Sequence, residues 1–396
     1  MTQSAPMHIL SISSNRADIG IIAPVWREIA ASANLRLTVF LTGSHVADSD
    51  YGRAAVPDGC AVHVGGADIA GQDGLECRNR TGQIESACAE LIAAAAPDLL
   101  LVVGDRIDMF PAVTASIPFN LPIAHIAGGD LSFGAVDERL RHAMTKLSHL
   151  HFVLNRHSAM RVFRMGEELD RIHIVGAPNL DTLKSVPVMT DGDFLTETGL
   201  PGLDRLRLVT VHPETNSRTP SAPLDAVLKA LDVHKDPVLF TAPNTDPGSA
   251  EMLPVIDAFC AERPWVVYRA NLGARLYANA MRRASTMIGN SSSGIIEAGL
   301  FGLSVINVGN RQEGREAADS VHHCAPDPGQ IADLMTRLAT RASGRPNGSL
   351  YGDGQAARRI RAVMEALPDP STLVIKRFQT EPVPAFKEPW ANSTDI

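Results

Sequence analysis

The sequence predicts an α/β protein in which a parallel sheet is wound twice along the chain. Its 396 residues are too many for one typical domain, so two domains of about 200 residues each are expected. Short runs of Val, Ile and Leu recur without alternating polar residues, which is typical of strands covered on both faces. A loop and a segment of helical periodicity follow each run, and this order of elements implies parallel strands.

The predicted strands fall into two groups on either side of a linker. The first group is His8–Ser13, Leu35–Leu41, Leu99–Val103, Ile123–Ile126, His151–Leu154 and Ile172–Val175. The second group is Leu206–Val211, Val238–Thr241, Trp265–Tyr268, Thr286–Ile288 and Ser304–Val308. The segment between them, residues 176–205, carries scattered Pro, Gly and Asp without strong apolar periodicity, as linkers do.

These groups set the expected domain boundaries. The first domain covers residues 1–180 and the second covers residues 205–350. A C-terminal helix and extension over 351–378 is expected to pack back across the domains. Residues 379–396 contain several prolines and few apolar residues, so they are predicted to form a flexible tail.

Composition and charge exclude several classes of protein. With 45% hydrophobic and 20% charged residues, the chain can bury real cores and is neither disordered nor fibrous. The 36 Lys and Arg against 44 Asp and Glu leave a net charge of -8, which argues against a broad nucleic-acid-binding face. A local basic pocket for phosphate is compatible with that total.

No segment of the sequence predicts a membrane span. The most apolar stretch, Leu91–Val103, is interrupted by Pro97 and Asp98 and is shorter than the roughly 20 residues that a span needs. The N-terminus shows no basic segment followed by an apolar one, so no secretory signal is indicated. We therefore expect a cytoplasmic protein without a membrane partner.

Cysteines and histidines do not predict a metal site. The five cysteines are odd in number and scattered, which fits free thiols better than disulfides or a zinc site. Six of the 13 histidines lie between residues 125 and 173, but no HExxH pair occurs among them.

Polar residues collect where predicted strands end, and this is the edge at which open α/β sheets bind ligands. The loops concerned are Ser13–Asp18, Gly104–Asp108, His125–Asp130, Thr210–Thr215 and Gly289–Glu297. The first three follow strands of the first domain and the last two follow strands of the second. Each domain is therefore expected to present a polar edge with glycines and charged groups.

The stretch from Ala124 to Phe152 is the densest in such residues. Asp137 and Arg141, like Glu138 and His142, are four apart on a predicted helix, where acid and base can pair. Spacing alone allows either a solvated helix face or a site. Asp130 follows two glycines at a strand end, where a short carboxylate can point at a ligand.

Two features of the second half point to an anion. His212 lies between an apolar strand and Pro213, where its imidazole is either a satisfied core group or an anion contact. The segment GNSSSGIIEA places three serines before a helix, where hydroxyl and backbone N–H groups bind phosphate or cap the helix. Arg311 and Arg315 follow and suit a diphosphate. Neither a Walker A motif nor a G-x-G-x-x-G after the first strand is present, which disfavours ATP hydrolysis and dinucleotide binding.

Several spaced motifs together resemble the hydrolysing UDP-N-acetylglucosamine 2-epimerases, the branch of the UDP-GlcNAc 2-epimerase family that serves sialic and legionaminic acid pathways. The motifs are RADIG at 16–20, TGSH at 42–45, GDR at 104–106, HIAGGD with GAVDERLRHAMTKLSHLHF, VTVHPET, PNTDPGS at 243–249, GNSSSGIIEA and INVGNRQEGR at 306–315. The resemblance implies two Rossmann-like domains of glycosyltransferase-B type, with the active site in the interdomain cleft and no cofactor or metal. It also implies a UDP-sugar substrate and a homodimer or homotetramer.

The resemblance assigns roles to individual residues. Asp105, Asp130 and Asp137 are expected to be acid/base carboxylates, and His212 is expected to act near the diphosphate leaving group. The expected substrate contacts are Arg16, Ala17, His45, Arg106, Glu138, Asn244, Ser291, Ser292, Ser293, Gly294, Glu297 and Arg311. The implied reaction eliminates UDP across C1–C2, adds water to the 2-acetamidoglucal at C1 and protonates C2 on the opposite face.

Two departures from the family pattern bear on the substrate. The first loop reads SNRAD where the family usually has GTRAD, and Asp130 stands where Glu is commoner. The motifs fit UDP-GlcNAc and a UDP-linked 2,4-diacetamido-2,4,6-trideoxy sugar equally well. A non-hydrolysing epimerase, a glycosyltransferase of the same fold and a catalytically inactive nucleotide-sugar-binding protein are the alternatives.

Overall fold

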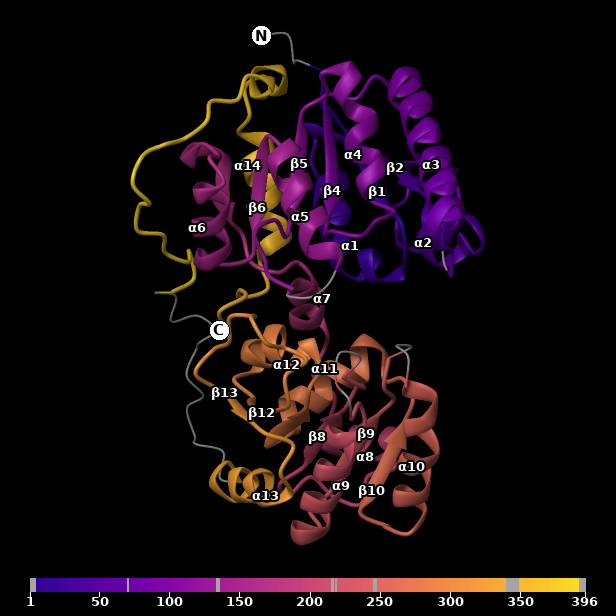
Figure 1. The fold of residues 1–396 in the computed structure, drawn as a ribbon, viewed down its shortest axis with the longest axis vertical. Helices are drawn as coiled ribbons and strands as arrows, with labels where there is room; N and C mark the ends of the chain where they lie inside the picture. Colours follow the sequence, from indigo (N-terminus) through magenta and orange to yellow (C-terminus); the bar gives the residue numbers. More distant parts are fainter. Residues whose placement is uncertain are drawn as a thin grey trace. The chain divides into compact units, whose positions relative to one another are not determined.

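The chain folds into two compact units. The computed structural model describes residues 5–69, 71–132, 136–214, 217, 219–244, 248–339 and 349–391 (Figure 1). One unit comprises Met1–Asp181 and Gly352–Asn392, and the other comprises Thr182–Tyr351. The chain therefore leaves the first unit once and returns to it near its C-terminal end.

The first unit is built on a seven-stranded parallel sheet with the order β3-β2-β1-β4-β5-β6-β7. Its strands are β1 (Met7–Ser13), β2 (Leu35–Leu41), β3 (Ala61–Val64), β4 (Leu99–Val103), β5 (Ile123–Ile126), β6 (Leu150–Val153) and β7 (Ile172–Ile174). The winding reverses between β1 and β4, where Ile9 pairs with Leu99. In doubly wound sheets such a reversal opens a crevice at the carboxyl ends of the strands.

The first unit carries eight α-helices among its described residues, one of which spans the boundary. They are α1 (Arg16–Ala30), α2 (Asp50–Ala55), α3 (Gly74–Ala95), α4 (Phe110–Ser116), α5 (Val136–Leu147), α6 (Arg156–Arg164), α7 (Asn179–Ser185) at the boundary, and α14 (Ala356–Glu365). Short 3₁₀ turns are η1 (Gly43–Val46), η2 (Ile117–Phe119), η3 (Leu169–Arg171) and η5 (Pro370–Val374). The returning helix α14 is held at its start by Asp181, whose carboxylate accepts from Ala356 N at 3.0 Å and Ala357 N at 2.7 Å.

The second unit repeats the plan with a six-stranded parallel sheet in the order β10-β9-β8-β11-β12-β13. Its strands are β8 (Arg207–Thr210), β9 (Val238–Thr241), β10 (Val266–Arg269), β11 (Thr286–Gly289), β12 (Ser304–Val308) and β13 (Val321–Cys324). Its helices are α8 (Asp191–Thr198), α9 (Ala222–His234), α10 (Ser249–Ala261), α11 (Gly273–Arg283), α12 (Ser292–Ile296), α13 (Pro328–Arg337) and the 3₁₀ turn η4 (Ala298–Phe301). Here the reversal lies between β8 and β11, where Gly289 pairs with Thr210.

Both sheets are buried on two faces, as the unbroken apolar runs predict. Every residue of β4 and β5 is buried, and so is every residue of β8, β9 and β11. The predicted fold class is confirmed. Two edge strands, β3 and β13, fall outside the apolar runs because their side chains are only partly buried and include histidines.

Two parts of the expected domain plan differ from the structure. Residues 176–205 are not a loose linker throughout, because α7 and α8 form there and Phe194 of α8 is fully buried. The guanidinium of Arg283 lies over the Phe194 ring and ties α8 to α11.

The predicted flexible tail also differs. Up to residue 391 the chain packs on the first unit beside α6, drawn in yellow in Figure 1. Gln379 N donates to Gly166 O at 2.9 Å, and the ring of Phe386 lies 6.2 Å from that of Phe163. Residues 392–396 lie outside the described part.

No helix among the described residues is both long enough and apolar enough to cross a bilayer.

Candidate active site

The first candidate loop follows β1 and opens α1. Asn15 caps α1 because its side-chain Oδ1 accepts from Ala17 N at 2.8 Å and Asp18 N at 3.2 Å. Arg16 is exposed and its Nη2 lies 2.8 Å from Asp48 Oδ2. The polar end of β1 therefore presents a helix N-terminus and a cation at the point where the winding reverses.

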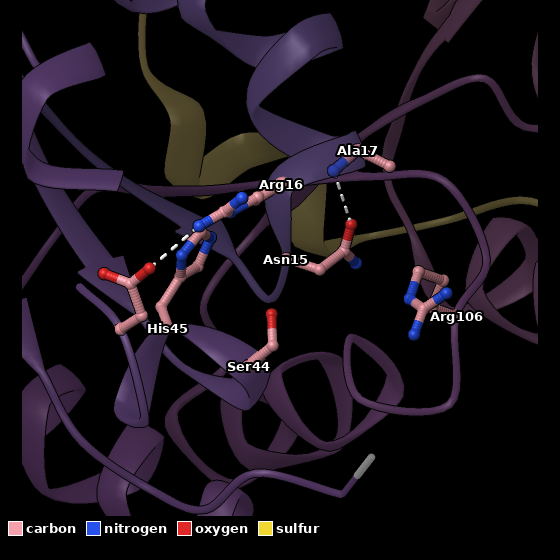
Figure 2. A pocket seen from close by; sticks show the side chains of 7 residues that line it. Asn15, Arg16, Ala17, Ser44, His45 and Arg106 are labelled. Carbon is pink, nitrogen blue, oxygen red and sulfur yellow. Dashed lines mark hydrogen bonds and ion pairs between the residues drawn. The ribbon is translucent and has the colours of Figure 1, made fainter. Parts of the chain in front are cut away.

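A pocket of ≈ 380 Å³ opens beside this loop and is lined by Asn15, Arg16, Ala17, Ser44, His45, Asp48 and Arg106. Figure 2 shows Arg16 and Arg106 on either side of Asn15. His45 is buried, its Nε2 lies 3.1 Å from Ser13 Oγ, and burial lowers the pKa of its ring, which keeps the imidazole neutral. The pocket brings together four residues predicted to contact substrate: Arg16, Ala17, His45 and Arg106.

Two buried carboxylates support the pocket and were not predicted. Asp18 is 5% exposed and accepts from Ser14 N and Ser14 Oγ, both at 2.8 Å. Burial raises the pKa of Asp18 to about 6. Asp108 is 2% exposed, and its Oδ1 lies 3.3 Å from Arg106 Nε. Asp18 and Asp108 are the last residues of two loops singled out in the sequence, Ser13–Asp18 and Gly104–Asp108, and this position was the available signal.

Asp105 follows β4 and is held by α5. The Nη2 of Arg141 donates to the Asp105 carboxylate and, at 2.9 Å, to Ser132 Oγ. The Nη1 of Arg141 donates to Asp130 O at 2.7 Å and to Glu138 Oε2 at 3.2 Å. One guanidinium thus joins the loops after β4 and β5.

Glu138 is a support within this network rather than an outward-facing group. Its Oε2 accepts from Ser132 N at 2.6 Å, and its Oε1 lies 3.0 Å from His142 Nε2. Burial opposes ionisation, but the bonds from Ser132 and His142 outweigh it and lower the pKa of Glu138. The spacing correctly predicted the Glu138–His142 pair, whereas Arg141 pairs with Asp105 and Glu138.

Asp137 has a different environment. It is partly buried at the start of α5, and burial, followed by the charge of Asp105, raises the pKa of its carboxyl group. Arg106 and Arg141 act in the opposite direction. Asp105 and Asp137 therefore form a carboxylate pair in which Asp105 has an arginine partner and the pKa of Asp137 is raised.

Asp130 is turned towards α6. Its Oδ1 accepts from Ser158 Oγ at 2.5 Å, and Arg161 Nε donates to the neighbouring Gly129 O. The backbone carbonyl of Asp130 accepts from Arg141 Nη1. Of the three predicted acid/base groups, Asp105 contributes to the raised pKa of Asp137, while the Asp130 side chain is bonded to α6.

His212 follows β8 and is fixed by its neighbours in the second unit. Its backbone N donates to Asn290 Oδ1 at 2.7 Å, and Asn290 Nδ2 donates to its carbonyl at 2.9 Å. Asn244 N donates to His212 Nδ1 at 2.9 Å. In the neutral ring this bond places the proton on Nε2, which is then the nitrogen that can donate to a ligand oxygen.

The serine segment follows β11. Ser291 caps α12 by accepting from Ser293 N at 3.4 Å. Ser293 Oγ bonds Glu297 Oε2 and lies 2.5 Å from the hydroxyl of Tyr277. A Cβ at Gly294 would come within 2.9 Å of Val305, so this glycine allows close packing on β12. Ser292 is the first residue of α12 and is partly buried.

The loop after β12 is held by residues of three quoted motifs, of which only Arg311 was predicted as a contact. Glu214 Oε1 accepts from Asn310 N at 2.6 Å and Arg311 N at 3.1 Å. Arg311 Nη1 and Gln312 Nε2 both donate to Asn290 O, at 3.4 and 3.0 Å. Asn290 therefore connects His212 with Arg311, and His212 in turn accepts from Asn244 N.

Residues 134, 135, 215 and 245–247, which belong to quoted motifs, lie outside the described part of the chain. Among the residues that the structure describes, no three His, Cys, Asp or Glu side chains gather as a metal ion would require.

The family model described as UDP-N-acetylglucosamine 2-epimerase matches residues 27–365. The chain belongs to this family. A family member from Legionella pneumophila, UDP-N,N'-diacetylbacillosamine 2-epimerase (hydrolyzing), is 30% identical over 378 residues, which is 93% of this chain and 98% of that protein. The GDP/UDP-N,N'-diacetylbacillosamine 2-epimerase (hydrolyzing) of Campylobacter jejuni is 28% identical over 78% of this chain and 81% of that protein.

A solved structure shows the same epimerase fold. The crystal structure of UDP-GlcNAc 2-epimerase from Neisseria meningitidis bound to UDP-GlcNAc matches with a TM-score of 0.73 at 16% identity, over 90% of this chain and 99% of that one. The chain is therefore an enzyme of the UDP-GlcNAc 2-epimerase family, and the named relatives of its sequence are of the hydrolysing type.

Proposed function

We propose that this epimerase is hydrolysing: it converts a UDP-linked 2-acetamido sugar and water to the free 2-epimer and UDP. Two substrates fit the motifs, UDP-GlcNAc and its 2,4-diacetamido-2,4,6-trideoxy analogue. The names of the Legionella and Campylobacter relatives favour the diacetamido sugar. Either product is of the type required for nonulosonic acids such as sialic or legionaminic acid.

The observation that carries the proposal is the unequal carboxylate pair. Elimination needs one group to take the C2 proton, and protonation of the glycal needs a group that delivers a proton to the other face. Asp105, paired with Arg141, suits the role of base, and Asp137, whose pKa is raised by burial, suits the role of proton donor. Water adds its oxygen at C1, so the C1–O bond to UDP is the bond that breaks.

The groups of the second unit suit the leaving nucleotide. Charge builds on the β-phosphate as the C1–O bond breaks, and His212 Nε2 and Arg311 can neutralise it. Ser291, Ser292, Ser293, Gly294, Glu297 and Asn244 are proposed as further contacts to phosphate and ribose. In the first unit, Arg16, Ala17, His45 and Arg106 are proposed to contact the nucleotide sugar beside the carboxylates.

Isotope labelling tests the proposal directly. Purified protein is incubated with each UDP-sugar in D₂O and, separately, in H₂¹⁸O. The expected product is the free 2-epimer with deuterium at C2 and ¹⁸O at C1, together with unlabelled UDP. A UDP-linked epimer would show the non-hydrolysing reaction, and product without deuterium at C2 would exclude elimination.

We further propose that the enzyme works in the cytoplasm as a homodimer or homotetramer. Light scattering on the purified protein measures the number of subunits, and a monomer at all concentrations would contradict the assembly.

A further inference from the structure

Arg141 is a buried arginine that does not belong to the proposed set of catalytic and substrate-binding residues. Its side chain is 8% exposed, and its two terminal nitrogens reach four acceptors from three segments of the first unit. Asp105 comes from the loop after β4, Asp130 O and Ser132 from the loop after β5, and Glu138 from α5 itself. A buried guanidinium is stable only when such partners satisfy it.

The surroundings keep this guanidinium in one orientation. Glu138 Oε2, which accepts from Arg141 Nη1, also accepts from Ser132 N at 2.6 Å. Glu138 Oε1 lies 3.0 Å from His142 Nε2. The loop of Asp105 is held independently, because His125 Nε2 bonds Gly104 O at 2.7 Å. A planar fork with fixed partners positions a carboxylate more narrowly than a single flexible ammonium can.

We propose that Arg141 is the positioning residue of the acid/base pair: it fixes the Asp105 carboxylate to the loop of Asp130 and Ser132. This inference rests on the proposed function. Arg141 acts through Asp105 rather than on the substrate, so its loss should reduce turnover more than substrate binding. A second consequence concerns Asp137, because the positive charge of Arg141 opposes the upward shift of the Asp137 pKa.

The test compares Arg141→Met, Arg141→Lys and Arg141→Ala with Arg139→Met. Arg139 is an exposed residue of the same helix and serves as the matched control. We expect Arg141→Met to lower kcat about 100-fold with KM within about threefold, since a misplacement near 1 Å has effects of that size. Arg141→Lys should recover part of the rate, and Arg139→Met should match the wild type. Guanidinium added to the assay should raise the kcat of Arg141→Ala about tenfold.

The titration of Asp137 is a readout that would not change if Arg141 had only a structural role. In Arg141→Met, the limb of the pH–rate profile that reports Asp137, and the ¹³C shift of its carboxyl group, should move to higher pH. Ser132→Ala removes one acceptor of Arg141 and the 3.3 Å bond from Ser132 Oγ to Glu138 Oε2. It should lower kcat about three- to tenfold and serves if Arg141→Met does not fold.

The possible outcomes of these experiments separate the role proposed for Arg141 from its alternatives. A rise in KM with unchanged kcat would make Arg141 a substrate contact and overturn the proposal, as would an equal loss in Arg139→Met or an unmoved Asp137 titration. Failure of the wild type to turn over either UDP-sugar would instead reject the proposed function, and the ¹³C titration would still decide whether Arg141 and Asp137 are coupled.

Discussion

The carboxylate of Asp130 accepts a 2.5 Å hydrogen bond from the hydroxyl of Ser158, at the first turn of α6. Arg161, one turn further along α6, donates to the carbonyl of Gly129. These two bonds connect the glycine loop after β5 to α6, and the Asp130 carboxylate makes one of them. Asp137 differs, since burial and Asp105 raise the pKa of its carboxyl group.

This contrast predicts different effects of two matched substitutions. Asp137→Asn should lower kcat about 10³-fold, within the range of a general acid or base, while UDP binding persists. Asp130→Asn should lower kcat no more than about tenfold, because an amide oxygen can still accept from Ser158, and Ser158→Ala should have a similar effect. Steady-state kinetics measures both. A loss in Asp130→Asn as deep as in Asp137→Asn, with Ser158→Ala unaffected, would return Asp130 to the acid/base chemistry.

The sequence predicts the strands and the polar loops at their ends, but not the contacts between loops that are distant in the chain. Unbroken apolar runs such as Leu99–Val103 locate strands because both faces of a central strand are buried, and the polar loops follow from the strand ends. Helical spacing predicted Glu138 with His142 but could not predict that Arg141 reaches Asp105, 36 residues away. Partners of that kind depend on which loops the sheet order brings together.

Buried supports were missed for a related reason. Nothing in the letters of RADIG distinguishes Asp18, which folds back onto Ser14, from a carboxylate facing substrate. Glu214 likewise reads as part of a ligand motif, yet it accepts backbone N–H groups nearly a hundred residues away. Proline content suggested a free tail, whereas burial of Glu388 and Trp390 depends on tertiary partners.

Gly289, at the end of β11, predicts a severe steric effect. Its φ is 138°, and an added Cβ would lie 1.8 Å from Thr210 O, a backbone atom of the paired strand β8. Gly289→Ala should lower the free energy of unfolding of the second unit by about 2–4 kcal/mol and weaken UDP binding. Gly20→Ala is the control, since a Cβ there meets nothing within 4 Å inside α1 and should stabilise by about 0.5–1 kcal/mol. Thermal unfolding measures both, and equal melting temperatures would contradict the expected clash.

Asp18 predicts a pH dependence of stability. Burial raises its pKa from 3.8 to about 6, so the folded protein binds a proton that the unfolded chain releases between these values. Stability from this group is therefore greatest at acidic pH and declines as pH rises towards 6, by up to about 3 kcal/mol. Relative to the wild type, Asp18→Asn should become more stable by that amount between pH 4 and pH 7 in urea unfolding. A difference independent of pH would show that Asp18 titrates normally.

The C-terminal segment is connected through α6 to the loop that carries Asp130. Glu388 is 8% exposed and accepts from Arg156 N at 3.3 Å and Arg156 Nη1 at 3.2 Å, at the start of the helix that holds Asp130. Ending the chain after residue 378 removes these bonds and the contact of Phe386 with Phe163, so the first unit should lose about 2–4 kcal/mol of unfolding free energy. Ending it after residue 391 keeps every described contact and should change nothing. Because α6 carries Ser158, the shorter protein should also turn over more slowly at a temperature where it remains folded. Thermal unfolding and kinetics on the two truncated proteins separate the outcomes: if both match the full chain, the segment contributes neither stability nor loop position.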